Sequence, residues 1–173
     1  MKINLQDLVL NTKVLKTGQK ILLRGTIYTA RDAAHKRIIN MLHIGEKSPI
    51  SLTNAAIYYC GPTPAKPGAI IGACGPTTSS RMDVFTPRLL KEGVKILIGK
   101  GARGEVVVDS IKENSAIYFV ATGGAAALIS KTVKKAELIA FEDLGPEAIY
   151  KLYVEDMPLI VAIDSFGNNI FKL

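Results

Sequence analysis

Short apolar and β-branched segments recur along the chain, and turn residues separate them. The segment Lys20–Thr29, KILLRGTIYT, is the longest and predicts a β-strand. Shorter segments of the same kind predict further strands at Ala55–Tyr59, Ala69–Cys74, Val94–Ile98, Ala116–Ala121, Ala136–Phe141 and Met157–Asp164. The sequence SFGNN after the last of these predicts a turn into a terminal hairpin.

Helical patterns lie between several of these strands. In Arg31–Leu42 the apolar residues fall near one face of a helix. TGGAAALIS predicts a glycine turn that opens a helix, and further helices are predicted at Arg81–Lys91, Arg103–Glu113 and Pro146–Leu152. Strands and helices alternate through the middle, so the sequence predicts an α/β fold with a mixed sheet. Because no linker or low-complexity tract appears, residues 1–173 are expected to form a single domain.

The composition is that of a folded domain, and it limits the classes of binding partner to be expected. Of the 173 residues, 48% are hydrophobic and 21% charged, which is enough for a substantial core. The formal net charge of +7 is compatible with a solvated basic surface, a nucleic-acid contact, or attraction of a small anion or acidic protein. Lys and Arg are scattered, and there is no polybasic tail, zinc finger or aromatic RNA-binding motif. A nucleic-acid partner is therefore not expected.

The sequence also argues against membrane and metal sites. No apolar run reaches the roughly 18 residues of a membrane span. The first residues, MKINLQDLVLNTK, lack the apolar stretch of a signal peptide, so a cytoplasmic location is expected. Cys60 and Cys74 are too few, and too far apart in the sequence, for a CxxC pair or a zinc site. Free buried thiols are expected.

Three polar clusters follow predicted strands, where ligands gather in α/β proteins. The first is TARDAAH, Thr29–His35. Arg31 stands at a predicted helix start, where the helix dipole disfavours a cation unless an anion is nearby. Asp32 and His35 are three residues apart and could share one helical face. Alternatively, Arg31 pairs with Asp32 or another acidic group, and His35 is a hydrogen-bonded polar residue.

The second cluster is GPTTSSRMD, Gly75–Asp83. Its glycine and proline predict a tight turn, so Thr77 and Thr78 lie in a loop whose backbone N–H groups are free to bind a carboxylate or phosphate. Arg81 adds a planar two-pronged donor. Alternatively, one hydroxyl only caps the helix and Asp83 complements its dipole. One cap accounts for one hydroxyl, not for four and an arginine.

The third cluster is GKGARG, Gly99–Gly104, in which glycines let the backbone approach a ligand and Lys100 and Arg103 supply charge. It matches neither GxxxxGK[ST] nor GxGxxG, so a solvated loop is an equal interpretation. The uncharged TGGAA, Thr122–Ala126, is better explained by close strand–helix packing.

Together the three clusters could bring Arg31, Arg81 and Lys100 to one site, which suits a small dicarboxylate. The sequence shows no metal-ligand cluster and no nucleophile motif, so the chain is expected to carry only part of a site.

Several ordered motifs resemble the C-terminal region of class I iron–sulfur fumarases and the separate β subunit of two-subunit fumarases and tartrate dehydratases. The motifs are GTIYTARDAAHKRI, YCGPTPAKPG, GACGPTTSSRMD, GKGARG, TGGAAAL, FEDLGPEAIYKLYVEDMP and DSFGNNIF. They extend over most of the chain, and its length is similar to that of the separate β subunit. Seven motifs in order are far more specific than any one of them.

The resemblance implies a swivelling β/β/α fold, like the mobile domain of aconitases. It also implies a [4Fe–4S] cluster with three cysteine ligands on the α region, whose remaining iron binds substrate as a Lewis acid. Two unpaired cysteines cannot make the usual cluster site. The cluster is therefore expected on a partner α subunit in a hetero-oligomer, and the isolated chain is expected to be colourless and inactive.

The resemblance assigns roles at the matching positions. It implies that Arg31 and Arg81 hold substrate carboxylate, that Lys100 contacts the second carboxylate and that Thr78 hydrogen-bonds the substrate. Thr77 is its candidate for the group that moves the proton at the carbon next to the carboxylate. A threonine is a poor base, so Thr77 could act only if a closed, cation-rich site stabilised its alkoxide or relayed its proton.

Three functions follow as hypotheses. The first is the β subunit of a fumarate hydratase, which interconverts fumarate and (S)-malate together with an α subunit. The second is the β subunit of an L(+)-tartrate dehydratase. The third, from a different class, is a non-catalytic anion-binding or regulatory module.

Overall fold

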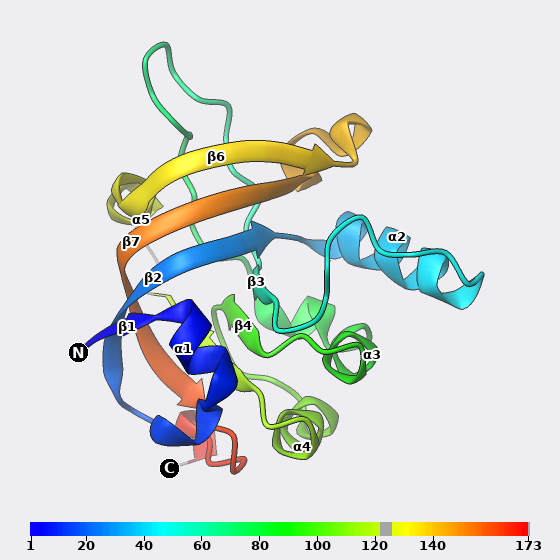
Figure 1. The fold of residues 1–173 in the computed structure, drawn as a ribbon, viewed down its shortest axis with the longest axis vertical. Coiled ribbons are helices and arrows are strands. Elements are labelled where there is room, and N and C mark those ends of the chain that lie inside the picture. The colour runs from blue at the N-terminus through cyan, green and yellow to red at the C-terminus, as the bar shows by residue number, and fades with distance from the viewer. Residues whose placement is uncertain (122–125, 173) are drawn as a thin grey trace.

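The computed structural model describes residues 1–121 and 126–172. Figure 1 shows strands and helices alternating through the middle of the chain. In order, the elements are β1 (Lys2–Asn4), α1 (Leu5–Leu10), β2 (Lys20–Thr29), α2 (Asp32–His43), β3 (Ala56–Tyr58), α3 (Thr86–Lys91), β4 (Ile96–Gly99), α4 (Glu105–Glu113), β5 (Ile117–Val120), α5 (Ala126–Thr132), β6 (Val133–Ala140) and β7 (Ile149–Ile163). Short 3₁₀ turns lie at Thr12–Val14, Ser79–Met82, Glu142–Glu147 and Ile170–Lys172.

The strands form one mixed sheet in the order β1-β2-β3-β4-β5-β7-β6. Strands β1 to β5 pair in parallel, and β7 is antiparallel to β5 and β6. The 15-residue β7 also pairs with β2, from Lys20↔Ile160 to Tyr28↔Lys151. Because β7 reaches both β5 and β2, the sheet folds over itself instead of staying flat.

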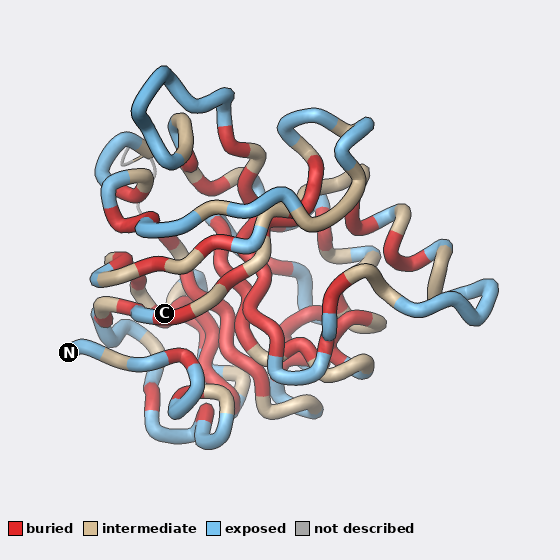
Figure 2. The backbone as a smooth tube through the Cα atoms, turned by 45° about the horizontal axis from the view of Figure 1, so that its top comes forward, coloured by how far each residue is buried: buried red, intermediate tan, exposed pale blue. Residues whose placement is uncertain are grey.

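The central strands β3, β4 and β5 are buried on both faces. Residues such as Ile98 and Phe119 pack with side chains of β2 and β7, while their neighbours Leu97 and Tyr118 pack with α2, α3 and α4. Burial on both sides explains why these strands read as continuous apolar runs. The result is a β/β/α arrangement, with the buried strands in the middle (Figures 1 and 2). The predicted α/β fold with a mixed sheet is confirmed.

Most predicted elements are present within a few residues of their expected bounds, and β2 has the predicted bounds. The predicted strand Ala69–Cys74 is wrong. Ile70 is 53% exposed, and this segment bonds within its own loop, where Thr63 N–H donates to Ala73 O at 3.0 Å. The apolar run alone does not make a strand, because the loop carries prolines without N–H donors and this segment pairs with no strand of the sheet.

The predicted helix Pro146–Leu152 is also wrong. Pro146 lies in the 3₁₀ turn Glu142–Glu147, and β7 begins at Ile149. Pairing of Leu152 with Ile27 of β2 determines the extended conformation there. The predicted strand Met157–Asp164 is the second half of β7, whose pattern is interrupted where Asp156 has a φ of 56°.

Two further predictions need adjustment. The predicted helix Arg81–Lys91 is divided into the 3₁₀ turn Ser79–Met82 and α3. In place of a terminal hairpin strand, the chain makes a single bridge, Ile163↔Asn169, and a 3₁₀ turn. The TGGAA prediction falls on residues 122–126, of which 122–125 lie outside the described residues. In the described ranges, every helix is too short or too polar to cross a membrane.

Candidate functional site

The predicted site residues lie where the parallel strands β2, β3 and β4 end. Thr77 binds the residue that follows β3, because both its N–H and its hydroxyl donate to Tyr59 O, at 2.8 and 3.0 Å. Lys100 directly follows β4 and forms a parallel bridge with Thr78. The structure therefore brings the threonine pair and Lys100 together between the ends of two neighbouring strands.

Asp32 connects the other two predicted residues. Arg81 Nε and Nη2 donate to the two carboxylate oxygens of Asp32 at 3.0 and 3.3 Å. Arg31 Nε lies 3.9 Å from Asp32 Oδ2, which is within ion-pair range but too long for a hydrogen bond. This Nε is buried and has no hydrogen-bond partner among the described residues. A Cβ on Gly61 would lie 3.0–3.1 Å from the Arg31 side chain, so the loop after β3 passes close to it.

The two guanidinium groups keep Asp32 ionised. Partial burial acts to raise the pKa of Asp32, but the hydrogen bond from Arg81, the backbone and the charges of Arg81 and Arg31 outweigh it, and the pKa is lowered. One carboxylate thus stands beside two cations. The arrangement fits the expected anion at the start of α2, but the anion present is a side chain of the protein.

His35 does not meet Asp32. Its side chain is buried, with Nδ1 2.8 Å from Arg31 O and the ring packed against Tyr59 and Phe85. Burial lowers the pKa of His35 to about 4, against the opposing effect of the hydrogen bond to Arg31. The imidazole is therefore neutral at pH 7 and donates from Nδ1. Its Nε2 has no partner in the part of the chain that the structure describes.

Arg103 has a structural place. Its side chain is 0% exposed, and its donors contact Asp83 Oδ1 (2.6 Å), Thr86 Oγ1 (2.7 Å) and Tyr59 Oη (3.3 Å). Asp83 Oδ2 accepts from Gly104 N at 2.8 Å. Asp83 therefore ties down the GKGARG loop and does not serve only the helix dipole. Of the two cations in this motif, only Lys100 is exposed.

Sequence reasoning missed the role of Ser79. No side-chain cap bond is made by Thr78, which precedes the 3₁₀ turn, and the Ser79 hydroxyl accepts from Lys100 N at 3.0 Å. Tyr118 Oη lies 2.9 Å from the same hydroxyl. Tyr118 stands within the continuous apolar run Ala116–Ala121, which is typical of a strand buried on both faces, and a buried tyrosine hydroxyl needs a polar partner. That signal could have pointed to this contact.

The two cysteines are free, buried and close together. Their sulfur atoms lie 3.0 Å apart although the two residues are 14 positions apart in the sequence, and the expected free buried thiols are confirmed. The hydrogen bond between them and burial raise the pKa of Cys60, so this thiol stays protonated. Within residues 1–121 and 126–172, no group of three or more metal-ligating side chains forms. The described residues do not fit an iron–sulfur cluster, whose ligands are thiolates.

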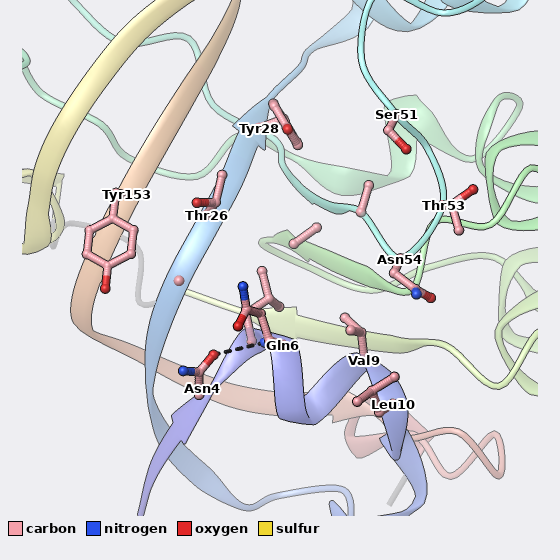
Figure 3. A pocket seen from close by; sticks show the side chains of 14 residues that line it. Asn4, Gln6, Val9, Leu10, Thr26, Tyr28, Ser51, Thr53, Asn54 and Tyr153 are labelled. Carbon is pink, nitrogen blue, oxygen red and sulfur yellow. Dashed lines mark hydrogen bonds between the residues drawn. The ribbon is translucent and has the colours of Figure 1, made fainter.

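A groove of about 520 Å³ lies elsewhere, beside α1 and the start of β3 (Figure 3). Among the described residues its lining carries no charged side chain. Its polar side chains are those of Asn4, Gln6, Thr26, Tyr28, Ser51, Thr53, Asn54 and Tyr153. It includes none of the predicted site residues. A groove without cations is poorly suited to a carboxylate, so the site at the strand ends remains the candidate.

Comparison with known proteins gives the same assignment as the motifs. The model of the Fumarase C-terminus family matches residues 1–173. A protein of Methanocaldococcus jannaschii named "Putative L(+)-tartrate dehydratase subunit beta" is 39% identical over 168 residues, covering 94% of this chain and 86% of that protein.

Longer relatives are also similar. Fumarate hydratase 2 of Leishmania major is 36% identical over 90% of this chain, and the aerobic class I fumarate hydratase of Escherichia coli K12 is 36% identical over 88%. The matched region is only 28% of each of these two proteins. This chain belongs to the Fumarase C-terminus family.

Proposed function

We propose that this chain is the β subunit of a two-subunit hydro-lyase that acts on a small dicarboxylic acid, with fumarate and (S)-malate as the first candidate pair. The family match and the class I fumarate hydratases among its relatives support this reaction type. The relative named as a β subunit, 86% of which is matched, supports the division into subunits. A cytoplasmic location stays a prediction.

The arrangement of charges at the strand ends carries the proposal. Arg31, Arg81 and Lys100 contribute three positive charges, and Asp32 contributes one negative charge. The balance is two positive charges, which matches a dicarboxylate dianion. A free energy gain from binding such an anion is largest where the cations are partly shielded from water, and the Arg31 side chain is only 29% exposed.

Each arginine has donors available for a carboxylate. The buried Nε of Arg31 lacks an acceptor among the described residues, and burying such a donor costs free energy unless a ligand accepts from it. Arg81 uses Nε and one N–H of Nη2 on Asp32, so its other N–H groups remain for a ligand. We assign both arginines to a substrate carboxylate and Lys100 to the second one.

The threonine pair completes the assignment. Thr78 is exposed beside Lys100 and is proposed to hydrogen-bond the substrate. Thr77 is proposed to move the proton at the carbon next to the carboxylate. The Tyr59 carbonyl fixes the Thr77 hydroxyl, and the three cations would stabilise its alkoxide or favour relay of its proton.

A partner subunit is needed to complete the site. The resemblance implies a [4Fe–4S] cluster, and the two buried thiols of this chain are unsuited to hold it because Cys60 is protonated. We therefore assign the cluster to the α subunit. The expected outcome for the isolated chain is a colourless, inactive protein, and a brown, active preparation would contradict the assignment.

The test is to co-express the chain with its α subunit under anaerobic conditions and to measure fumarate hydration. Arg31→Ala is expected to lower kcat/KM by about 100-fold or more, because a charged hydrogen bond to substrate is lost. Arg37→Ala is the matched control, because Arg37 lies on α2, the helix that Arg31 precedes, and pairs with Asp143 at the surface. Full activity of Arg31→Ala, or an equal loss in Arg37→Ala, would contradict the site assignment.

L(+)-tartrate is the second candidate substrate, favoured by the name of the Methanocaldococcus jannaschii relative. Dehydration of tartrate gives oxaloacetate. The same complex should be supplied with tartrate and with fumarate in parallel assays, and the ratio of the two kcat/KM values decides between them. Failure with both, although the complex forms, would favour a non-catalytic anion-binding module.

A further inference from the structure

Ser79 holds both backbone groups of Lys100. Its N–H donates to Lys100 O at 3.0 Å, and its hydroxyl accepts from Lys100 N at 3.0 Å. The Ser79 side chain is fully buried, whereas Lys100 itself is exposed. One buried residue therefore fixes the backbone of an exposed lysine just past the end of β4.

Tyr118 extends this contact into a directed chain of hydrogen bonds. Its hydroxyl lies 2.8 Å from Gly101 O and 2.9 Å from Ser79 Oγ. A carbonyl oxygen can only accept, so the single Tyr118 proton goes to Gly101, and the Ser79 hydroxyl donates to Tyr118. The chain therefore runs from Lys100 N–H through Ser79 and Tyr118 to Gly101 C=O. Linked hydrogen bonds of this kind polarise and strengthen one another.

The surroundings are shaped for this chain. A Cβ on Gly99 would collide with Ser79 Oγ, so only glycine at the end of β4 leaves room for the hydroxyl. The guanidinium carbon of Arg103 lies over the Tyr118 ring, 5.0 Å from its centre, so the ring is also held by a cation–π contact. The two buried hydroxyls, together with the space left by Gly99, fix the backbone of Lys100–Gly101.

We propose that Ser79 and Tyr118 are positioning residues that fix the Lys100 backbone, so that its ammonium group starts from one defined place beside Thr78. A lysine has a long, flexible side chain, and fixing its backbone reduces the ordering cost of a contact with an anion. The fixed backbone is independent of the proposed function. The effect of Ser79 and Tyr118 on substrate binding rests on the proposed function.

The first test uses the isolated chain and needs no activity. Ser79→Ala removes the acceptor of Lys100 N–H, so residue-resolved amide hydrogen exchange at Lys100 is expected to accelerate about 10-fold or more. The reference is the Tyr59 amide, which donates to Ile98 O. Unchanged exchange at Lys100 relative to this reference would overturn the proposal.

A matched variant controls for general loss of stability. Tyr58→Phe removes the same group from an equally buried tyrosine, whose hydroxyl donates to Cys74 O at 2.6 Å and does not touch the Lys100 segment. Tyr118→Phe is expected to accelerate exchange at Lys100 relative to the reference amide, and Tyr58→Phe is not. Equal behaviour of the two variants would contradict a specific role.

The second test is a double-mutant cycle in the complex with the α subunit. Tyr118→Phe is expected to raise KM for fumarate about 10-fold, but no more than about 2-fold when Lys100 is already alanine, because it acts through Lys100. Independent effects of the two substitutions would overturn the positioning role. If the wild-type complex turns over no dicarboxylate, the proposed function fails, and the exchange measurement still decides whether Lys100 is held.

Discussion

Two arginine–aspartate pairs lie at the same end of the sheet and differ in exposure. The Arg103 side chain is 0% exposed and hydrogen-bonds three side chains. The Arg81 side chain is 46% exposed, and among the described residues its side chain hydrogen-bonds only Asp32. Each guanidinium nitrogen of the buried Arg103 donates to a side chain of the protein. The exposed one keeps donors for a ligand, and this difference separates a structural arginine from a binding arginine.

The electrostatics of the buried pair agree with this distinction. Burial acts to lower the pKa of Arg103, but Tyr59 and Asp83 outweigh it and raise the pKa, so the guanidinium remains charged in the interior. Removing one partner of such a pair leaves the other as an uncompensated charge. An exposed pair gains little, because water solvates both ions almost as well.

The largest expected effect tests this difference directly. Arg103→Ala is expected to lower the free energy of unfolding by ~3–5 kcal/mol, since Asp83 is left without its counterion. Arg81→Ala is expected to cost under about 1 kcal/mol. Urea unfolding of the isolated chain measures both.

For the stability that each substitution costs, the activity of the complex should be more sensitive to Arg81→Ala than to Arg103→Ala. Arg81→Ala is expected to lower kcat/KM about 100-fold while the complex stays folded, because a charged hydrogen bond to substrate is lost. Equal destabilisation by the two substitutions would remove the distinction between the pairs. Full activity of Arg81→Ala would show that exposure alone does not identify a binding arginine.

A smaller effect concerns His35, whose pKa is influenced by one charge from each pair. Burial lowers its pKa to about 4; the charge of Arg103 also lowers it, and that of Asp32 raises it. The unfolded chain binds this proton below about pH 6.5, while the folded chain does so only below about 4. The contribution of the neutral His35 to the free energy of unfolding is therefore fully present above about pH 6.5. It is lost as the pH falls, by about 2 kcal/mol at pH 5.

The matched variants isolate this contribution from that of the carboxylates. His35→Asn keeps a donor near the position of Nδ1 but does not titrate, so its loss of stability between pH 7 and 5 should be about 2 kcal/mol smaller than that of the wild type. His43→Asn changes an exposed histidine and should keep the full loss. Urea unfolding at both pH values checks this, and identical pH dependence in His35→Asn and wild type would contradict a neutral buried imidazole.

The sequence predicted the strands that show a clear pattern and have partners nearby. β2 was found with its bounds because its apolar and β-branched residues continue for ten positions. Ala69–Cys74 was wrong for a physical reason: strand formation depends on a hydrogen-bonding neighbour, and the sequence does not show which segments lie next to each other. The same limit concealed the first half of β7, whose extended conformation depends on pairing with β2.

The candidate site was predictable to the extent that parallel strands end at one edge of a sheet. This rule predicts that Arg31, Thr77 and Lys100 lie near one another. The structure pairs Thr78 with Lys100 and Thr77 with the residue after β3. It could not separate Arg81 from Arg103, because both are arginines in polar clusters that follow predicted strands. Their difference lies in burial and in the number of partners, which arise from contacts between segments distant in the sequence.

The smallest effect tests what Asp32 does to the exposed pair. Asp32 binds the side of the Arg81 guanidinium through Nε and Nη2, and so it orients the remaining donors instead of blocking them. Asp32→Asn keeps the shape, removes the negative charge and weakens the orientation, so KM for fumarate should rise about 3-fold with little loss of stability. Asp143→Asn is the control, because Arg37 and Asp143 form a similar two-bonded pair away from the site. A fall in KM would mean that Asp32 competes with the substrate for Arg81. The ion pair between Asp32 and Arg81 would then block the site and would not orient Arg81 for the substrate.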